Sequence, residues 1–426
     1  SNNKAQFNNR FQYAQTLEAM GEVAYSRGKT IEAFTAFENA RTRLEALLKI
    51  QPNNLELLTL AGANAFWLGQ LHYDKSDYAA TEPLFKKYHA YSEKMYSLAP
   101  NDFNAIMELS YAQNSLGSIH MKQQNFAAAR EAFEQSLLLK LQLWQQDNTN
   151  SQLIADIADT RSWIASAATA QGDINAAIKI HEQIQQLLVN NALEKQPYLL
   201  ERLTSSYRFL ASLMSYQGHS SQAFTKAQLG LDTITNALKQ DPDNDVWKLK
   251  QYYAYLDMLT FSTQYIEKHM DYSIETLTKN LSKDIALANS NKKNPLLAKF
   301  QLSAATYLAS QDLLPQGLVY AQKAIASFKQ LTIEFTQDTS YSINLAQSKM
   351  LTARLLNALN RHKDVHTLCE QSKVLLASIA EKSNAPQFTV PYAQALDCLG
   401  ELDQHPSLLQ LLQQSAITDF RFSPKP

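Results

Sequence analysis

Few side chains of this sequence are spaced as catalytic or metal-binding residues would be. The first candidate is His181. His181-Glu182 begins like the zinc-binding HExxH helix, in which two histidines bind the metal and the glutamate activates water. Gln185, however, stands where the second histidine should be. We therefore interpret His181 as a histidine packed in a helical core.

The nearest approach to a metal constellation is formed by His362, Asp364, His366 and Cys369. His362 and His366 are four residues apart and would share one face of a helix, as zinc ligands can. Against this, His362 is expected in a turn between helices and Cys369 at a core position. We expect no metal site and no cofactor.

Cys369 and Cys398 are the two cysteines of the chain. Each is expected on a helix that packs against the helix of the other. In an oxidising compartment they could form a disulfide, whereas in the cytosol both would be small buried hydrophobic residues. Phosphate-binding glycine loops, GxSxG elbows and CxxC pairs are absent from the sequence, so we expect a protein without enzymatic activity.

The elements that position these residues repeat along the chain. Small residues recur at Gly21, Gly69, Gly117 and Ala165, with a constant period of about 48 residues. Twelve positions after each come Ala33, Thr81, Ala129 and Ala177, and sixteen after each come Phe37, Phe85, Phe133 and His181. A fixed period of roughly 20–50 residues is typical of solenoids built from repeated structural units. We call the spacing of these residues the long period.

Hydrophobic residues within each repeat recur at the helical period, and Pro with Asn or Asp marks most joints between repeats. In the first repeat, Gly28 is expected to end one helix and Thr30 to cap the next. The sequence predicts an all-α, α-α superhelical solenoid of about nine helical hairpins. We expect a linker over 1–8, five regular hairpins over 9–240, degenerate hairpins 6–9 over 241–420, and a tail over 421–426.

The hairpins resemble the tetratricopeptide repeat. In the first hairpin Met20-Gly21, Gly28, Ala33 and Phe37 match that repeat's pattern of small and aromatic residues. The usual period of that repeat is about 34, so helices here should be about two turns longer. The segment Tyr392–Gly400 is similar to the C-terminal repeat regions of proteobacterial signalling proteins that carry a serine/threonine kinase or winged-helix domain.

This resemblance implies a binding groove, because first helices line the concave face of tetratricopeptide stacks. The positions that match by register are polar, with several tyrosines. They are Glu22, Tyr25, Phe66, Gln70, Tyr73, Tyr111, Asn114, Asp159 and Arg208, with Glu18, Ser118, Ser162, Ser166, Ser205 and Ser212 beside them. Such a face would suit a peptide. A cluster of Lys and Arg that could clamp a terminal carboxylate is missing from this set, since Arg208 stands alone.

The sequence therefore favours a scaffold that binds a protein or peptide, as the C-terminal module of a larger bacterial signalling or regulatory protein. The alternative is a sensor domain for a small molecule or cell-wall fragment, which a closed pocket lined by Trp247, Tyr255 and Tyr265 would favour. A net charge of −1 argues against nucleic acid as a partner of this segment, and no apolar stretch reaches the roughly 20 residues that span a bilayer.

The chain starts Ser1-Asn2-Asn3 without methionine, so we expect the natural protein to extend further towards its N-terminus. Any membrane anchor or targeting signal would lie there. Whether the protein is periplasmic or cytoplasmic would depend on that N-terminal segment.

Overall fold

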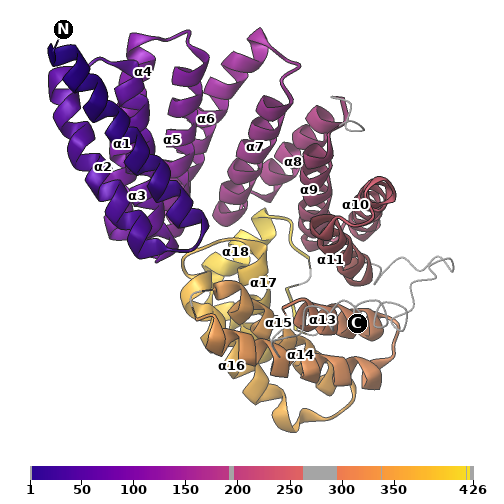
Figure 1. The fold of residues 1–426 in the computed structure, drawn as a ribbon. Coiled ribbons are helices and arrows are strands. Elements are labelled where there is room, and N and C mark those ends of the chain that lie inside the picture. Colours follow the sequence, from indigo (N-terminus) through magenta and orange to yellow (C-terminus); the bar gives the residue numbers. More distant parts are fainter. Residues whose placement is uncertain (1, 191–195, 262–294, 337, 419, 423–426) are drawn as a thin grey trace. The chain divides into compact units, whose positions relative to one another are not determined.

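The computed structural model describes residues 2–190, 196–261, 295–336, 338–418 and 420–422, and within them all regular structure is helical. The chain divides into two compact units, Ser1–Ala167 and Ala168–Pro426. Within each unit, consecutive helices pack side by side in antiparallel pairs (Figure 1). The predicted fold class, an all-α solenoid of helical hairpins, is confirmed.

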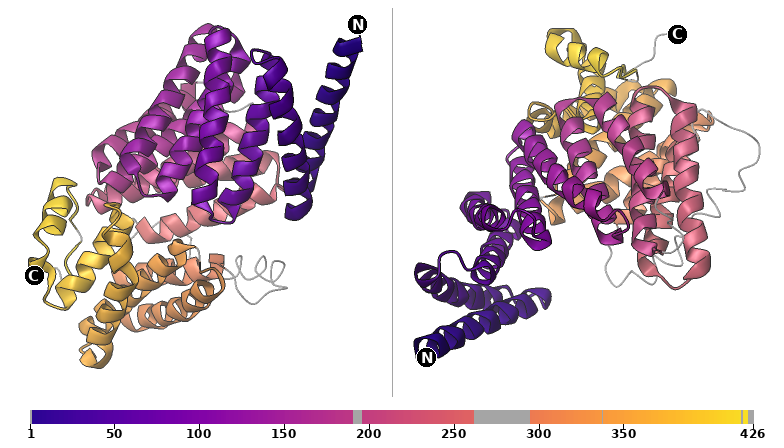
Figure 2. Two further views of the ribbon diagram at one scale, coloured as in Figure 1. Left: turned by 90° about the vertical axis from the view of Figure 1, so that its left-hand side faces the viewer. Right: turned by 90° about the horizontal axis from the view of Figure 1, so that it is seen from above.

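The first unit stacks long helices of similar length, and Figure 2 shows their packing from two further sides. Its helices are α1 (Asn2–Ser26), α2 (Thr30–Ile50), α3 (Leu55–Asp74), α4 (Tyr78–Leu98), α5 (Phe103–Lys122), α6 (Phe126–Gln146) and most of α7 (Ser151–Gln171). Helices of 20 or 21 residues replace the shorter ones of the usual tetratricopeptide repeat, which accounts for the long period.

The second unit continues the same alternation of first and second helices. Its helices are α8 (Ile174–Asn190), α9 (Pro197–Tyr216), α10 (Ser220–Gln240), α11 (Asp245–Phe261), α13 (Pro295–Ser310), α14 (Leu314–Glu334), α15 (Thr339–Ala358), α16 (Val365–Ala380), α17 (Pro386–Cys398) and α18 (Pro406–Gln414). Part of the degenerate hairpins predicted over 241–420 falls on 262–294, outside the described residues.

The glycines and aromatic residues of the long period meet in one contact that is repeated from hairpin to hairpin. A Cβ atom added to Gly21 would lie 2.4 Å from Cε1 of Phe37, and one added to Gly117 would lie 2.4 Å from Cε1 of Phe133. Gly69 meets Phe85 in the same way, at 2.6 Å. Only a glycine lets the ring approach the backbone this closely, so the two helices of each hairpin are held in register.

The joints between hairpins are capped as the sequence predicts. The Asn54 side chain accepts a hydrogen bond from the Leu57 backbone N–H, and Asp102 accepts one from Ala105. Gly28 has a φ of 71°, the left-handed conformation expected of a residue that ends a helix. Thr30 was the wrong cap, because α2 already begins at Thr30 and no side chain caps it.

The two ends of the chain depart from the predicted domain limits. α1 begins at Asn2, so the linker predicted over 1–8 is largely helical. The reason is Phe7, which packs with Phe11 against the core of the first hairpin and extends its apolar stripe by one turn. In the predicted tail, the backbone N–H of Phe422 donates to Asp397 at 2.8 Å. The predicted boundary at 240/241, which separates the regular hairpins from the degenerate ones, stays a prediction.

The last helices of the second unit return to its first ones. The backbone N–H of Asn384 donates to the Ala170 carbonyl at 2.8 Å, and the Ser415 hydroxyl donates to the Gly172 carbonyl at 2.9 Å. Gly172 has a φ of 85°, and a Cβ there would lie 2.7 Å from Leu411. The turn between α7 and α8 is therefore shaped to receive the C-terminal hairpin.

Cys369 and Cys398 are joined by a disulfide in the structure, with their Cα atoms 6.3 Å apart. Cys369 is fully buried on α16, and Cys398 ends α17. The pairing follows from the hairpin order, since the second helix of one hairpin packs on the first helix of the next.

If the bond forms in solution, reduction should raise the intact mass of the oxidised protein by the mass of two hydrogen atoms. Intact-mass spectrometry before and after a reducing agent measures this directly. Cys398→Ser is the control and should show no change on reduction. An unchanged mass in the wild-type protein would mean that both cysteines are free thiols.

Candidate functional site

The second unit contains a cavity of about 470 Å³ between its first helices. Its lining comes from α9, α11, α13, α15 and α17, which are first helices of successive hairpins. Each of these helices presents to the cavity the side chains that recur about once per helical turn. Cavities of roughly 300–1,000 Å³ are typical of ligand sites, so this cavity is the candidate site of the unit.

The wall formed by α9 and α11 carries an ion pair beside an aromatic ring. Arg208 donates to Asp257, and the two side chains are 36% and 16% exposed. The Arg208 guanidinium lies 5.0 Å from the centre of the Tyr253 ring, and Lys299 Nζ lies 4.9 Å from the same centre. Two cations therefore share one aromatic ring, an arrangement stabilised by cation–π attraction.

A third cation, Arg354 of α15, also lines the cavity and is held by the end of the chain. Its Nε donates to the Phe422 carbonyl at 3.1 Å. Asn344, Gln347 and Gln394 add amide groups to the lining. Among the described residues, the lining thus has three basic side chains against one acidic one, and its chemistry is that of an anion-binding cavity.

Burial sets the protonation chemistry of the ion pair. Burial raises the pKa of Asp257, and the charges of Arg208 and Lys299 oppose that rise. Burial also lowers the pKa of Lys299, and the neighbouring Arg208 lowers it further. An added anion would stabilise both cations. The described residues of the lining include neither histidine nor cysteine, so they offer no histidine-activated nucleophile for catalysis.

Three of the predicted groove residues, Arg208, Ser212 and Tyr111, line cavities. Arg208 and Ser212 line the cavity just described, and Tyr111 lines a separate cavity in the first unit. Glu22 is exposed on α1, and Asp159 is half-buried on α7. Asn114 is buried, with its side-chain oxygen unpartnered among the described residues. The binding role of the predicted set stays a prediction.

Four more of the predicted positions form two packed groups in the first unit. The Tyr25 hydroxyl donates to Asp74 at 2.7 Å, and Gln70 donates to the other oxygen of the same carboxylate at 2.7 Å. Phe66 and Tyr73 pack against Phe85, with ring centres 6.0 and 6.3 Å apart. These aromatic residues pack the two helices of one hairpin, α3 and α4, against each other.

The residues that would have favoured a sensor pocket lie elsewhere. Trp247 is 3% exposed in the core between α9, α10 and α11, where Tyr255 packs against it. Tyr265 lies outside the described residues. The cavity is lined on that side by Tyr253 instead.

The sequence did not single out Lys299 or Arg354. Both lie in the degenerate hairpins, where the long period no longer assigns positions to the groove face. One signal was available, because Ala305 and Ala353 keep the long period and each lies on the same helix as one of these cations. Extending the register from these alanines would have placed Lys299 and Arg354 on first helices.

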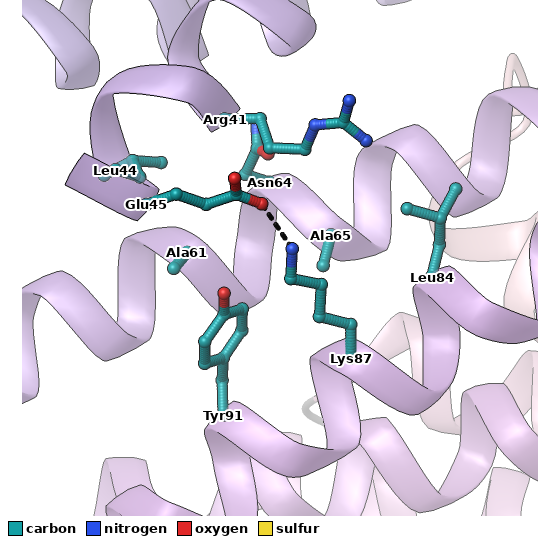
Figure 3. Close-up of a pocket in the computed structure, with 9 residues that line it drawn as sticks. All are labelled: Arg41, Leu44, Glu45, Ala61, Asn64, Ala65, Leu84, Lys87 and Tyr91. Carbon is teal, nitrogen blue, oxygen red and sulfur yellow. Dashed lines mark hydrogen bonds and ion pairs between the residues drawn. The ribbon is translucent and has the colours of Figure 1, made fainter. Parts of the chain in front are cut away.

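A much smaller polar pocket lies between α2, α3 and α4 of the first unit (Figure 3). Its volume of about 10 Å³ holds roughly one water molecule, so it is no ligand site. Lys87 pairs with Glu45 across it, and Asn64 forms part of its wall. Asn64 also donates to the buried Glu18 at 2.8 Å, and burial raises the pKa of Glu18 to about 7.

Glu18→Gln should stabilise the protein by about 1–2 kcal/mol at pH 8, because it removes a buried negative charge. With a pKa of about 7 in the folded state against 4.5 in the unfolded state, Glu18 binds protons more tightly when folded. Its contribution therefore falls as pH rises from 4.5 through 7. Urea unfolding at pH 5 and pH 8 should show the difference between variant and wild type mainly at pH 8. An equal difference at both pH values would contradict this.

The histidines lie where the sequence places them. His181 is buried, its Nδ1 is 3.3 Å from the Ser206 hydroxyl, and its ring stacks on Phe209. Burial lowers its pKa to about 4. His362 falls in a short 3₁₀ turn between α15 and α16. Among the described residues, no group of three or more His, Cys, Asp or Glu is placed to hold a metal ion.

Comparison with known proteins gives structural likeness alone. No protein-family model matches the chain, and no curated protein matches it. The apo form of the quorum sensor NprR from B. thuringiensis is 14% identical, with 88% of this chain and 98% of that chain covered and a TM-score of 0.46. Yeast Tom70 is 14% identical, with 95% and 92% covered and a TM-score of 0.33.

The MamA protein is 15% identical, with 55% of this chain and 96% of that chain covered and a TM-score of 0.32. At these identities and TM-scores, the comparisons report a likeness in fold and nothing more. In the described part of the chain, none of the helices has the length and apolar character needed to cross a bilayer.

Proposed function

We propose that the chain is a non-enzymatic scaffold that binds an acidic segment of a protein or peptide partner in the cavity of its second unit. The observation that carries this proposal is the excess of cations in that cavity. Among the described lining residues, three cations, Arg208, Lys299 and Arg354, face a single carboxylate, that of Asp257. A partner carboxylate would gain charge-assisted hydrogen bonds from cations that are already held in place.

An extended peptide suits the lining better than a compact apolar molecule does. Serine, threonine and amide side chains from several helices lie beside the cations and can pair with a peptide backbone. Leu256, Leu302 and Val390 add apolar surface for neighbouring side chains. This combination supports recognition of a segment that carries acidic and apolar residues together.

Binding of blocked nonapeptide pools tests the proposal. An acid pool carries glutamate at three fixed positions, and a matched amide pool carries glutamine there, with the other positions random. Fluorescence anisotropy with the full chain should show binding of the acid pool, weakened by added salt. Equal binding of both pools, or none, would contradict the proposed function.

A small anionic molecule or cell-wall fragment is the second candidate, and the volume of about 470 Å³ favours it. Saturation by short carboxylate compounds that displace the acid pool would support it.

The wider setting is also a proposal. We infer that the chain serves as the C-terminal module of a larger bacterial signalling or regulatory protein, on the resemblance of Tyr392–Gly400. The reading frame upstream of Asn2 tests this, because a kinase or winged-helix domain there is expected. A secretion signal alone would contradict it.

A further inference from the structure

The first unit contains a second cavity, of about 410 Å³, between α3, α5 and α7. These are again first helices of successive hairpins. Phe103, Met107 and Leu153 give it an apolar side, whereas Glu108 and Asp156 give it an acidic one. The described residues that line it include no lysine, arginine or histidine, so its charge is opposite to that of the cavity in the second unit.

The two carboxylates are held in fixed positions by tyrosines. The Tyr88 hydroxyl donates to Glu108 at 2.8 Å, and the Tyr111 hydroxyl donates to Asp156 at 2.9 Å. Gln152 donates to the second oxygen of Asp156 at 3.2 Å. Neutral donors orient these groups without neutralising them. Burial raises the pKa of Glu108, so a cation in the cavity would stabilise its charged form.

A buried lysine, Lys140, packs on the Tyr111 ring, and its ammonium group already has a hydrogen-bond partner. Lys140 is 1% exposed, lies 5.4 Å from the centre of the Tyr111 ring, and donates to Thr160 at 2.7 Å. It is not among the described residues that line the cavity. It supports the ring of Tyr111, and its charge also attracts those of Asp156 and Asp159 from outside the cavity. None of the described residues that line the cavity is basic, so a ligand cation can reach both Glu108 and Asp156 from within it.

Exposed aromatic surface at the cavity indicates a partner side chain as the occupant. Phe103 is 46% exposed and Tyr111 37% exposed, although both are large and apolar. An arginine side chain can stack its guanidinium on such a ring and pair with a carboxylate at the same time. A lysine ammonium can also lie over a ring, but it cannot stack flat on the ring and pair with a carboxylate through two parallel hydrogen bonds, as a guanidinium can. A metal ion would use the carboxylates only.

We propose that this cavity binds an arginine side chain of an extended partner segment, with Glu108 and Asp156 as its counter-charges. A neighbouring apolar residue of the partner packs on Phe103, Met107 and Leu153. The proposal rests on the function proposed above, that of a peptide-binding scaffold, but concerns a different unit and the opposite charge.

A basic pool of the same nonapeptides, with arginine at the three fixed positions, tests the site. Glu108→Gln combined with Asp156→Asn should weaken its binding to the full chain by about tenfold. Both changes keep an oxygen that can accept the tyrosine hydrogen bond, so folding should persist. Glu134→Gln, at an exposed carboxylate paired with Arg130 on α6, is the matched control and should bind as wild type does.

The methyl resonance of Met107 gives a readout that needs no variant of the carboxylates. With ¹³C-methyl methionine in the full chain, the basic pool should shift Met107 and leave Met350, in the other cavity, unchanged. Unchanged affinity in the double variant, or a basic pool that binds without moving Met107, would overturn the proposal. A basic pool that does not bind at all would overturn it as well, whereas failure of the acid pool alone would overturn only the function proposed above.

Discussion

Gly117→Leu is expected to destabilise the first unit by about 2–4 kcal/mol, because the new side chain has no space. A Cβ at this position would already lie 2.4 Å from Cε1 of Phe133, a ring that is itself 2% exposed. Neither the ring nor the backbone of α5 can move without opening the contact between α5 and α6. Urea unfolding followed by circular dichroism measures the free energy of unfolding.

Two companion variants separate packing from other causes. Ser118→Leu, at the half-buried neighbour on the same helix, should change stability far less. Phe133→Ala in the Gly117→Leu background should cost less than Phe133→Ala alone, because the leucine fills the space left by the ring. Full additivity, or a neutral Gly117→Leu, would mean that these two residues do not set the register of the hairpin.

Arg208→Gln combined with Lys299→Gln should weaken binding of the acid pool by about 100-fold, which corresponds to roughly 2.7 kcal/mol. Each cation contributes a charge-assisted hydrogen bond worth about tenfold in affinity, and both flank the Tyr253 ring. Glutamine retains hydrogen-bonding capacity but no charge, so the loss would measure the electrostatic part. Fluorescence anisotropy titrations measure it.

Two further variants serve as controls for the affinity of this cavity for the acid pool. Lys239→Gln, on the exposed end of α10, should leave the affinity unchanged. Asp257→Asn should strengthen binding, because it releases Arg208 from its ion pair and removes the one negative charge among the described lining residues. If the double variant binds the acid pool as tightly as the wild type, the cavity is not its site.

Periodicity was sufficient to predict the hairpins of the regular part of the chain, up to Lys239. Gly21, Gly69 and Gly117 face the predicted rings, and Asn54 and Asp102 cap the predicted joints. These features depend on contacts within a hairpin or between neighbours, which a repeated local pattern encodes. The same pattern missed the helical start at Asn2, where a single apolar residue, Phe7, extends the first helix.

The candidate site was predicted only in part, because it depends on contacts between residues distant in sequence. Arg208 was identified by register, whereas Arg354 reaches its position through a carbonyl of Phe422, 68 residues later. Lys299 belongs to a degenerate hairpin, in which Ala321 instead of an aromatic residue stands sixteen positions after Ala305. Neither the return of the C-terminal hairpin nor the sharing of Tyr253 by two cations has a periodic signature.

The methyl resonance of Met350 tests the central claim most directly. Met350 is 1% exposed and lines the cavity of the second unit, and Met107 provides the reference in the first unit. Titration of the full chain, labelled with ¹³C-methyl methionine, with the acid pool should shift Met350 and leave Met107 unmoved; Met350→Leu assigns the signal. Binding of the acid pool with no shift of Met350 would place the ligand elsewhere and contradict the proposed function.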